Sequence, residues 1–297
     1  MENVQDKYRK VLVESLVLDD DVAVEAQVRE ILDKHFDENN NVNVWKQCFH
    51  SIDLTTLNST DTVQSVTRFV QRVNDFETDY PQLPNVAAIC TYPNFAMVVS
   101  GTLEVSEVGT AVVAGSFPSS QTFVEVKTAE TALAVADGAT EVDIVFNLGL
   151  YYDEQYEELA DEIAEIKHAC RDARLKVILE TGALKKAADI KNAAILSMWS
   201  GADFIKTSTG KVYPGATLEA AYVMCQCIKE YHKKTGRKVG FKVSGGVSTT
   251  DDAVRYYTLV KEILGDEWLT NEWFRIGTSR AANVILSSIL GKETKHF

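Results

Sequence analysis

Short apolar runs rich in β-branched residues alternate with amphipathic stretches along most of this chain. Each run, with the stretch that follows it, fills about 25–40 residues, the size of one strand–helix unit. Strands are predicted at residues 48–54, 86–92, 111–117, 141–147, 176–181, 203–208, 239–243 and 274–277. Helices are predicted between them at residues 62–73, 120–136, 156–169, 184–199, 218–232, 251–264 and 280–290.

The predicted strands are apolar almost throughout, which indicates a parallel sheet covered by helices. Eight repeats favour closure into a (β/α)8 barrel, the TIM barrel, over a doubly wound open sheet. No Gly-x-Gly-x-x-Gly pattern of a dinucleotide-binding fold follows the first strand. We therefore expect an α/β protein built around a TIM barrel.

The N-terminal segment has a different pattern. Residues 8–17 and 22–36 are predicted amphipathic helices, and one face of the second carries four apolar residues, Val24, Val28, Ile31 and Leu32. Residues 37–41 form a predicted polar linker. The sequence therefore predicts an N-terminal helical extension at residues 1–47 and a (β/α)8 barrel catalytic domain at residues 48–297.

Composition and charge narrow the classes of partner. The chain has 45% hydrophobic and 25% charged residues, which is usual for a globular protein with a large core. Its 43 acidic and 30 basic residues give a net charge of −13, which argues against nucleic acid as a partner. A few lysines and backbone N–H groups still suffice to bind one phosphate.

No apolar run has the length of a membrane span, and the first residues lack the apolar core of a signal peptide. The five cysteines have no repeated spacing, which argues against a disulfide framework or a zinc site and agrees with the reducing cytoplasm. The five histidines are scattered, so no metal site is predicted. A Gly-x-Ser-x-Gly nucleophile elbow is absent as well.

Two lysines lie inside apolar strands, where a charged amine is costly unless it is neutralised, paired or used. Lys206 is in the segment 203–211 and Lys242 in the segment 239–246, and a turn rich in Ser, Thr or Gly follows each. A single buried lysine is well explained by an ion pair. Two lysines at matching depth in consecutive strands favour an amine used in covalent chemistry.

A lysine attacks a carbonyl group only when its amine is neutral, and burial or a second cation lowers its pKa. Lys242 would be that cation, and neutral Lys206 would form an iminium ion with an aldehyde or ketone. Alternate strands of a TIM barrel fill the same interior layer, so Asp143 of the fourth strand is expected to meet Lys206 of the sixth. There Asp143 would assist proton transfer, with a structural ion pair as the alternative. This chemistry requires no metal or cofactor.

Turns for a phosphate group follow three of the strands. Barrels often bind phosphate in the loops after the seventh and eighth strands, at the N-terminus of a helix. The candidates there are Gly245, Gly246, Gly277, Thr278 and Ser279. The turn after the sixth strand adds Thr209, Gly210 and Lys211.

Together these segments resemble the deoxyribose-phosphate aldolases, a family of Schiff-base (class I) aldolases. The similarity extends from about residue 52 to residue 279, in the order of the family. It is carried by residues 53–57, 90–93, 141–145, 178–182, 204–211, 240–246 and 275–279. Members of that family reversibly cleave 2-deoxy-D-ribose 5-phosphate into acetaldehyde and D-glyceraldehyde 3-phosphate.

The resemblance implies a role for each candidate. Lys206 would be the Schiff-base lysine, Lys242 its activating partner and Asp143 the proton relay. Asp53 and Cys90 would lie at the substrate, although a role of Cys90 as a small core residue is equally open. The remaining candidates would bind the substrate and its phosphate: Thr209, Gly210, Lys211, Gly245, Gly246, Gly277, Thr278 and Ser279.

The chain departs from the family pattern in three places. Many members have an arginine where this chain has Ser248, which cannot supply a guanidinium. Some members end in a tyrosine implicated in proton shuttling, whereas this chain ends in Phe297. The extension has no match in shorter members, so packing on the barrel and mediating assembly as a homodimer or larger homo-oligomer both stay open.

Two other functions share part of the pattern. A different class I aldolase or a transaldolase would use the same lysine chemistry, but the paired lysines and following glycines fit it less well. A non-catalytic sugar-phosphate-binding protein would keep the glycine loops without needing two buried lysines.

Overall fold

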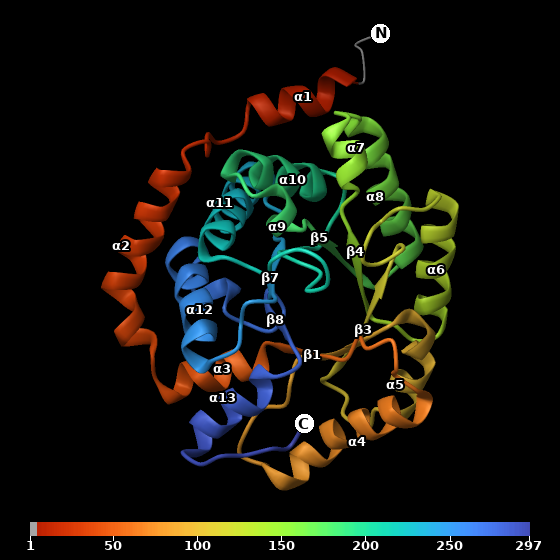
Figure 1. Ribbon diagram of the computed structural model, residues 1–297, viewed down its shortest axis with the longest axis vertical. Coiled ribbons are helices and arrows are strands. Elements are labelled where there is room, and N and C mark those ends of the chain that lie inside the picture. Colours follow the sequence, from red (N-terminus) through yellow and green to blue (C-terminus); the bar gives the residue numbers. More distant parts are fainter. Residues whose placement is uncertain (1–4) are drawn as a thin grey trace.

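Eight parallel strands close into a barrel in the order in which they occur in the chain (Figure 1). The computed structural model describes residues 5–297. The strands are β1 (Ile52–Thr55), β2 (Ala88–Thr91), β3 (Gly109–Ala114), β4 (Glu141–Val145), β5 (Arg174–Ile178), β6 (Phe204–Lys206), β7 (Gly240–Ser244) and β8 (Phe274–Thr278). β8 pairs with β1, which leaves no free sheet edge. The predicted TIM barrel is confirmed.

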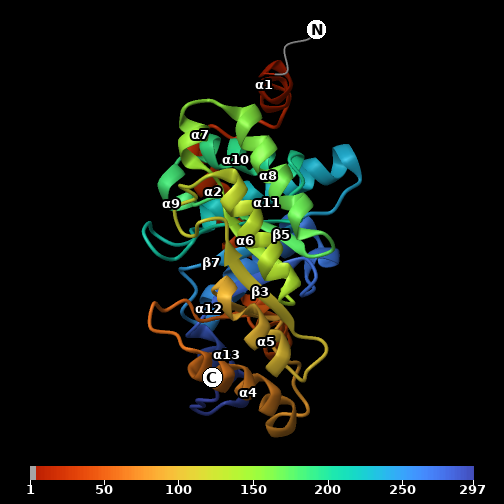
Figure 2. The same cartoon turned by 90° about the vertical axis from the view of Figure 1, so that its right-hand side faces the viewer.

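Helices surround the barrel, and Figure 2 shows α6 and α8 lying along one side of it. The extension carries α1 (Gln5–Val13), α2 (Asp21–Asn39) and α3 (Val42–His50). The helices between and after the strands are α4 (Val63–Asp79), α5 (Ala96–Thr102), α6 (Val124–Ala136), α7 (Leu148–Tyr152), α8 (Tyr156–Cys170), α9 (Thr181–Leu184), α10 (Ala187–Trp199), α11 (Leu218–Thr235), α12 (Thr250–Leu264) and α13 (Ala281–Leu290). Short 3₁₀ turns occur at Pro93–Phe95 and Asp266–Trp268. Among residues 5–297, no helix combines the length and apolar character needed to cross a bilayer.

The first predicted strand was placed too early. Residues 48–50 belong to α3, and β1 begins only at Ile52. The side chain of Asn41 accepts hydrogen bonds from the backbone of Asn43 and Val44 and so caps the start of α3. Val44 and Cys48, four residues apart, are both buried, which is a helical spacing that the short apolar run concealed. The predicted linker at 37–41 is also wrong, because α2 continues to Asn39.

The helix after β2 was missed in the sequence. α5 has only seven residues and contains β-branched Val98 and Val99 together with Gly101, all of which weaken a helical signal. It nevertheless packs against α4 and β3, so the strand–helix alternation is complete.

The extension packs along one side of the barrel (Figure 1). α1 contacts α8 and α10, α2 contacts α11 and α12, and α3 contacts α12 and α13. Val24, Val28 and Leu32 are buried in this interface and Ile31 is partly buried, as the apolar face of the second helix predicted. The interior of the protein thus continues from the barrel helices into the extension, and the division at residue 47 stays a prediction.

The end of the chain packs between helices. The ring of Phe297 lies 5.6 Å from that of Phe76 and 6.1 Å from that of Phe49, measured between centroids. The side-chain oxygen of Asn283 accepts hydrogen bonds from the backbone of His296 and Phe297. The last residue therefore contributes to an aromatic cluster between α3 and α4.

Different sides of the barrel interior carry different side chains. Near β2 and β3 it is filled by a small apolar cluster of Leu57, Ala88, Cys90, Ala111 and Val113. The other strands turn long charged side chains inward, because alternate strand positions face the barrel axis. The small residues on one side leave room for lysine and arginine side chains from the other.

The position of α3 predicts how truncation will act. Removing residues 1–40 deletes α1 and α2 but leaves α3, whose Cys48 and Phe49 are fully buried. Removing residues 1–47 cuts α3 and exposes the core beside Phe76. We expect the second truncation to lower the melting temperature much more than the first in circular dichroism. Equal melting temperatures would show that α3 is not part of the barrel core.

Candidate active site

A pocket of about 750 Å³ opens at the carboxyl ends of the strands, the end at which TIM-barrel enzymes carry their active sites. Four of the strands and the loops that follow them line it, namely β1, β6, β7 and β8. The lining includes Lys206, Thr209, Gly210, Lys211, Ser244, Gly245, Gly246, Ser248, Gly277, Thr278, Ser279 and Arg280. All the predicted phosphate-binding residues are among these.

Lys206 lies on the floor of this pocket with 3% of its surface exposed. Lys242 lies beside it, because Lys206 and Lys242 are register partners on β6 and β7. Asp143 and Lys242 are completely buried and do not line the pocket. A molecule in the pocket can therefore reach the amine of Lys206 but not the two groups behind it.

One carboxylate oxygen joins the two lysines. Asp143 Oδ2 lies 2.8 Å from the Nζ atoms of both Lys206 and Lys242. Its other oxygen, Oδ1, lies 3.0 Å from Nζ of Lys176 on β5. The contact between Asp143 and Lys206 agrees with the expectation that strands four and six meet in the barrel.

Asp143 belongs to a closed cycle of six charges, which we call the ionic ring. In it each carboxylate lies between two cations: Asp143, Lys242, Asp53, Arg275, Glu141, Lys176 and back to Asp143. Every member is at least nine-tenths buried. Lys206 contacts the ring only at Asp143, from outside the cycle.

The far side of the ionic ring is held by Arg275 on β8. Its guanidinium lies 2.6 Å from Asp53 Oδ1 and 2.7 Å from Glu141 Oε1. Lys242 also contacts Asp53, and Lys176 contacts Glu141. The ring is thus closed by direct contacts without a gap.

The surroundings move the two lysine pKa values in opposite directions. Burial lowers the pKa of Lys206; Asp143 opposes this and Lys242 lowers it further, so the net direction is down. Burial would also lower the pKa of Lys242, but Asp143 and Asp53 hold it above its ordinary value. Of the two amines, Lys206 is therefore the one that loses its proton more readily, beside the Lys242 cation.

The carboxyl group of Asp143 stays ionised. Burial alone would raise its pKa, but Lys176, Lys206 and Lys242 together hold it well below the ordinary value. The pKa of Asp53 is likewise low, because Lys242, Arg275 and Lys176 outweigh the effect of its burial. Both groups are fixed negative charges at neutral pH.

The structure places two candidates outside the lining of the pocket. Asp53 does not line the pocket but binds Lys242 and Arg275 below its floor. Cys90 is fully buried in the small apolar cluster, and burial raises the pKa of its thiol. The core role left open for Cys90 fits its position, and Asp53 acts on the pocket only through Lys242.

The turn after β6 is held by side chains from its neighbours. Glu180 accepts hydrogen bonds from the backbone N–H and the hydroxyl of Thr209, at 3.1 and 2.6 Å. Thr207 Oγ1 donates to the carbonyl oxygen of Ser244 and accepts from its N–H. These contacts fix the loop that carries Gly210 and Lys211 beside the pocket.

The glycines after β7 are required by their backbone. Gly246 has φ of +87°, and a Cβ there would lie 2.7 Å from the carbonyl oxygen of Ala216. Gly245 has φ of +66° and approaches Gly215 closely. The pair therefore presents backbone to the pocket, where N–H groups are free to meet an anion.

Arg280, at the start of α13, was not among the candidates. It lines the pocket beside Ser279 and is exposed. Its guanidinium has no hydrogen-bond or ion-pair partner within residues 5–297. Two other cations, Lys206 and Lys211, line the pocket, and Nζ of Lys211 contacts the carbonyl oxygen of Leu57. The only signal in the sequence was the position of Arg280, one residue beyond the predicted phosphate turn.

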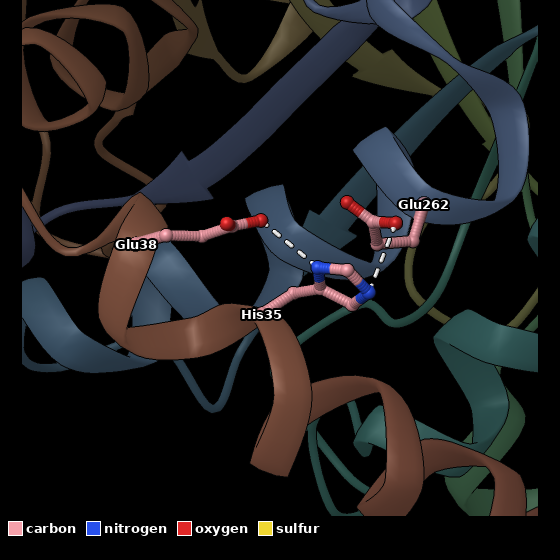
Figure 3. A group of neighbouring side chains, drawn as sticks. All are labelled: His35, Glu38 and Glu262. Atoms are coloured by element: carbon pink, nitrogen blue, oxygen red, sulfur yellow. Dashed lines mark hydrogen bonds and ion pairs between the residues drawn. The ribbon is translucent and has the colours of Figure 1, made fainter.

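One group of side chains outside the barrel has the composition of a metal site. In the part of the chain that the structure describes, His35, Glu38 and Glu262 lie close together (Figure 3). Glu38 contacts Nδ1 of His35 at 2.9 Å and Glu262 contacts Nε2 at 3.4 Å. The two carboxylates thus lie at opposite nitrogens of one ring, and each pairs with the imidazole. The group ties α2 to α12 instead.

Comparison with known proteins agrees with this geometry. Residues 48–259 match the profile of the DeoC/LacD family of aldolases. The chain belongs to this aldolase family. It is therefore an enzyme of the carbon–carbon lyase class.

Relatives within the DeoC/LacD family match most of the chain. A Caenorhabditis elegans protein with the provisional name deoxyribose-phosphate aldolase is 47% identical over 231 residues, covering 77% of this chain and 76% of its own. The mouse deoxyribose-phosphate aldolase is 41% identical over 240 residues, covering 77% and 75%. Among solved structures, the tetrameric deoxyribose phosphate aldolase from Aeropyrum pernix superposes with a TM-score of 0.68 at 26% identity, over 88% of this chain and 97% of its own.

Three members of the ionic ring were missed in this family member's sequence. Glu141 and Arg275 lie near the starts of β4 and β8, where a charge is easily taken for a strand end at the surface. Lys176 lies in a predicted strand, but it lacks the turn of Ser, Thr and Gly that closely follows Lys206 and Lys242. The available signal was a charged residue directly beside an apolar one in each of these strands: Val142 follows Glu141, Leu175 and Val177 flank Lys176, and Phe274 and Ile276 flank Arg275.

Replacing Asp143 by asparagine tests its role in proton transfer. The amide keeps the shape but loses the charge and the second acceptor oxygen. We expect turnover to fall by roughly 100-fold or more, the scale of general acid–base assistance, with the barrel still folded. A variant that melts early but keeps normal specific activity would identify Asp143 as a structural ion-pair partner only.

Replacing Lys242 by methionine tests its role as the activating cation. The change keeps the length of the side chain, removes a positive charge and leaves Asp143 with one cation fewer, so the pKa of Lys206 should rise. Adduct formation at Lys206 should be nearly lost at neutral pH and partly recovered in alkali, because only the neutral amine reacts. Trapping rates against pH check this, and an unshifted profile with a lower plateau would assign Lys242 to binding or proton transfer.

Proposed function

We propose that this protein is a deoxyribose-phosphate aldolase that cleaves 2-deoxy-D-ribose 5-phosphate through a Schiff base on Lys206. The observation that carries the proposal is the position of Lys206. It is the one member of a buried charged cluster that reaches the pocket, and its pKa is lowered by burial and by Lys242. The names and identities of the relatives support the choice of substrate.

The reaction follows from a neutral amine at the pocket floor. Lys206 Nζ adds to the C1 aldehyde of the open-chain sugar, and loss of water from the carbinolamine gives an iminium ion. Removal of the C3 hydroxyl proton then breaks the C2–C3 bond and releases D-glyceraldehyde 3-phosphate. The two bond electrons form an enamine on Lys206. Protonation at C2 and hydrolysis release acetaldehyde and return the amine, without a cofactor.

Asp143 is suited to move protons during the first steps. Its Oδ2 contacts the amines of both Lys206 and Lys242, so a proton can pass between them through a single oxygen. Addition to the aldehyde leaves a surplus proton on nitrogen and requires one on the departing hydroxyl group. We therefore assign the relay to Asp143 and the proton reserve to Lys242.

The phosphate end of the substrate is assigned to the pocket rim. The Gly245–Gly246 turn and the start of α13 present backbone N–H groups, and α13 adds the positive end of its dipole. Thr278, Ser279 and Gly277 complete that side. Arg280 supplies a guanidinium at the rim. Ser248 has only a hydroxyl group, and this hydroxyl donates to Asp252.

The alternative functions that the sequence left open differ in what they require of Lys206 at the pocket floor. A non-catalytic sugar-phosphate-binding protein needs the rim but not an amine with a lowered pKa. Another class I aldolase or a transaldolase would use Lys206 with a ketose phosphate as donor. The trapping experiment below separates these functions.

Compartment and assembly are also proposals. All five cysteines, Cys48, Cys90, Cys170, Cys225 and Cys227, are free and buried, which supports a reducing compartment, the cytoplasm. Assembly as a homodimer or larger homo-oligomer is supported by the tetramer named for the Aeropyrum pernix enzyme. With a net charge of −13, nucleic acid is not a proposed partner.

Borohydride trapping tests the covalent step. Acetaldehyde plus borohydride should ethylate one lysine, and peptide mass mapping should place the label on Lys206. Lys206→Ala should lose both the label and the cleavage of deoxyribose 5-phosphate. Label on Lys211 or Lys242 would refute the assignment, trapping by ketose phosphates alone would identify a different aldolase, and no trapping would favour a binding protein.

Replacing Arg280 by glutamine tests the phosphate site. Loss of a charge-assisted contact should raise KM for deoxyribose 5-phosphate about 10-fold or more and leave unphosphorylated deoxyribose unaffected. Lys292→Gln, which removes an exposed cation beyond the end of α13, is the matched control and should change neither value. Adding Ser248→Arg to the Arg280→Gln variant should recover part of the loss. Equal losses on both sugars would indicate general disruption instead.

A further inference from the structure

The charges of the barrel interior balance only if one amine is neutral. The ionic ring contains three carboxylates, Asp53, Glu141 and Asp143, and three cations, Lys176, Lys242 and Arg275. When all six are ionised the ring is neutral. Lys206 is a fourth cation in the same buried volume. Since an unbalanced buried charge is costly, the interior as a whole favours the loss of one proton.

The contacts decide which amine loses that proton. Each cation of the ring contacts two or more carboxylates: Lys242 contacts Asp143 and Asp53, and Arg275 contacts Asp53 and Glu141. Lys176 contacts Glu141 and Asp143 and lies 3.6 Å from Asp53. Lys206 contacts only Asp143, which it shares with Lys242 and Lys176. The proton is therefore held least strongly at Lys206.

We propose that Arg275, Glu141 and Lys176 are positioning residues that set the reactivity of Lys206 through the charge balance of the ionic ring. None of the three lines the pocket. They act because the ring is closed: removing one cation leaves three carboxylates with two, and Lys206 becomes the replacement third cation. The proposal rests on the Schiff-base function proposed above and extends it to residues that cannot touch the substrate.

The groups that act most strongly on the charge of Lys206 lie in the barrel interior. They are Asp143 on β4, Lys242 on β7 and Cys90 on β2. Burial keeps the thiol of Cys90 in its neutral form, because it raises the pKa of that group. Phe204 on β6 and Ile178 on β5, the register partner of Lys206, are buried and uncharged.

The pH dependence of borohydride trapping at Lys206 tests the proposal. Arg275→Met removes a ring cation, so Lys206 should stay protonated to higher pH. We expect the trapping profile to move up by at least one pH unit, which is about a tenfold slower reaction below the midpoint. Arg275→Lys keeps the charge with fewer hydrogen bonds and should leave the midpoint unchanged.

A compensated double variant separates charge from packing. Arg275→Met together with Glu141→Gln leaves two carboxylates and two cations in place of three and three, so the balance is restored. The midpoint should return toward that of the wild type even though two buried contacts are lost. If Arg275→Met does not fold, Lys176→Met with and without Glu141→Gln makes the same comparison on another strand.

The outcomes are distinguishable from failure of the proposed function. If wild-type protein is not labelled at Lys206, the Schiff-base function itself is wrong. If the wild type is labelled but Arg275→Met and Arg275→Lys shift the midpoint equally, or the double variant stays shifted, the charge-balance proposal is overturned alone. A shift in Arg275→Met that the double variant reverses supports it.

Discussion

Electrical balance inside the barrel constrains much of this structure. Charges removed from water cost several kcal/mol each unless they are paired at close range, so the interior must supply partners on every side. The ionic ring does this with residues from β1, β4, β5, β7 and β8, which are distant in sequence. A closed barrel is the arrangement that brings these strands around one axis. The environment of Lys206 therefore depends on the completeness of the barrel and not on one loop.

Long charged side chains also need space, and small residues provide it. Ala88, Cys90 and Ala111 occupy the opposite side of the interior. A Cβ at Gly277 would lie 3.2 Å from Cε of Lys242, and one at Gly240 would overlap the ring of Phe204. Packing therefore explains these glycines, Gly277 beside Lys242 and Gly240 beside Phe204. Gly245 and Gly246 differ, because their positive φ shapes the pocket rim.

The sequence predicted the strand–helix alternation well, because each unit buries a local pattern that can be recognised within about 25–40 residues. It also predicted that Lys206, Lys242 and Asp143 lie together, because their apolar neighbours place these charges inside the barrel. It could not reveal the ionic ring, because Glu141 and Arg275 find their partners only after closure of the barrel. A buried lysine is also not a sufficient signal. Lys127 on α6 is fully buried, yet it does not line the pocket, and its contacts with Ser120 and Glu162 give it a structural explanation.

The floor and the rim of the pocket are built from different interactions. They therefore differ in how readily they tolerate an amino-acid substitution. The floor consists of fixed, fully paired charges in which any single replacement disturbs the whole ring. The rim consists of glycine backbone and exposed cations, where a charge can move between loops at little cost. Ser248 is held by Asp252 at the start of α12, while Arg280 on α13 carries the free guanidinium on the other side of the rim. A phosphate needs a cation nearby and not a particular loop, so a serine at 248 is compatible with the proposed reaction at Lys206.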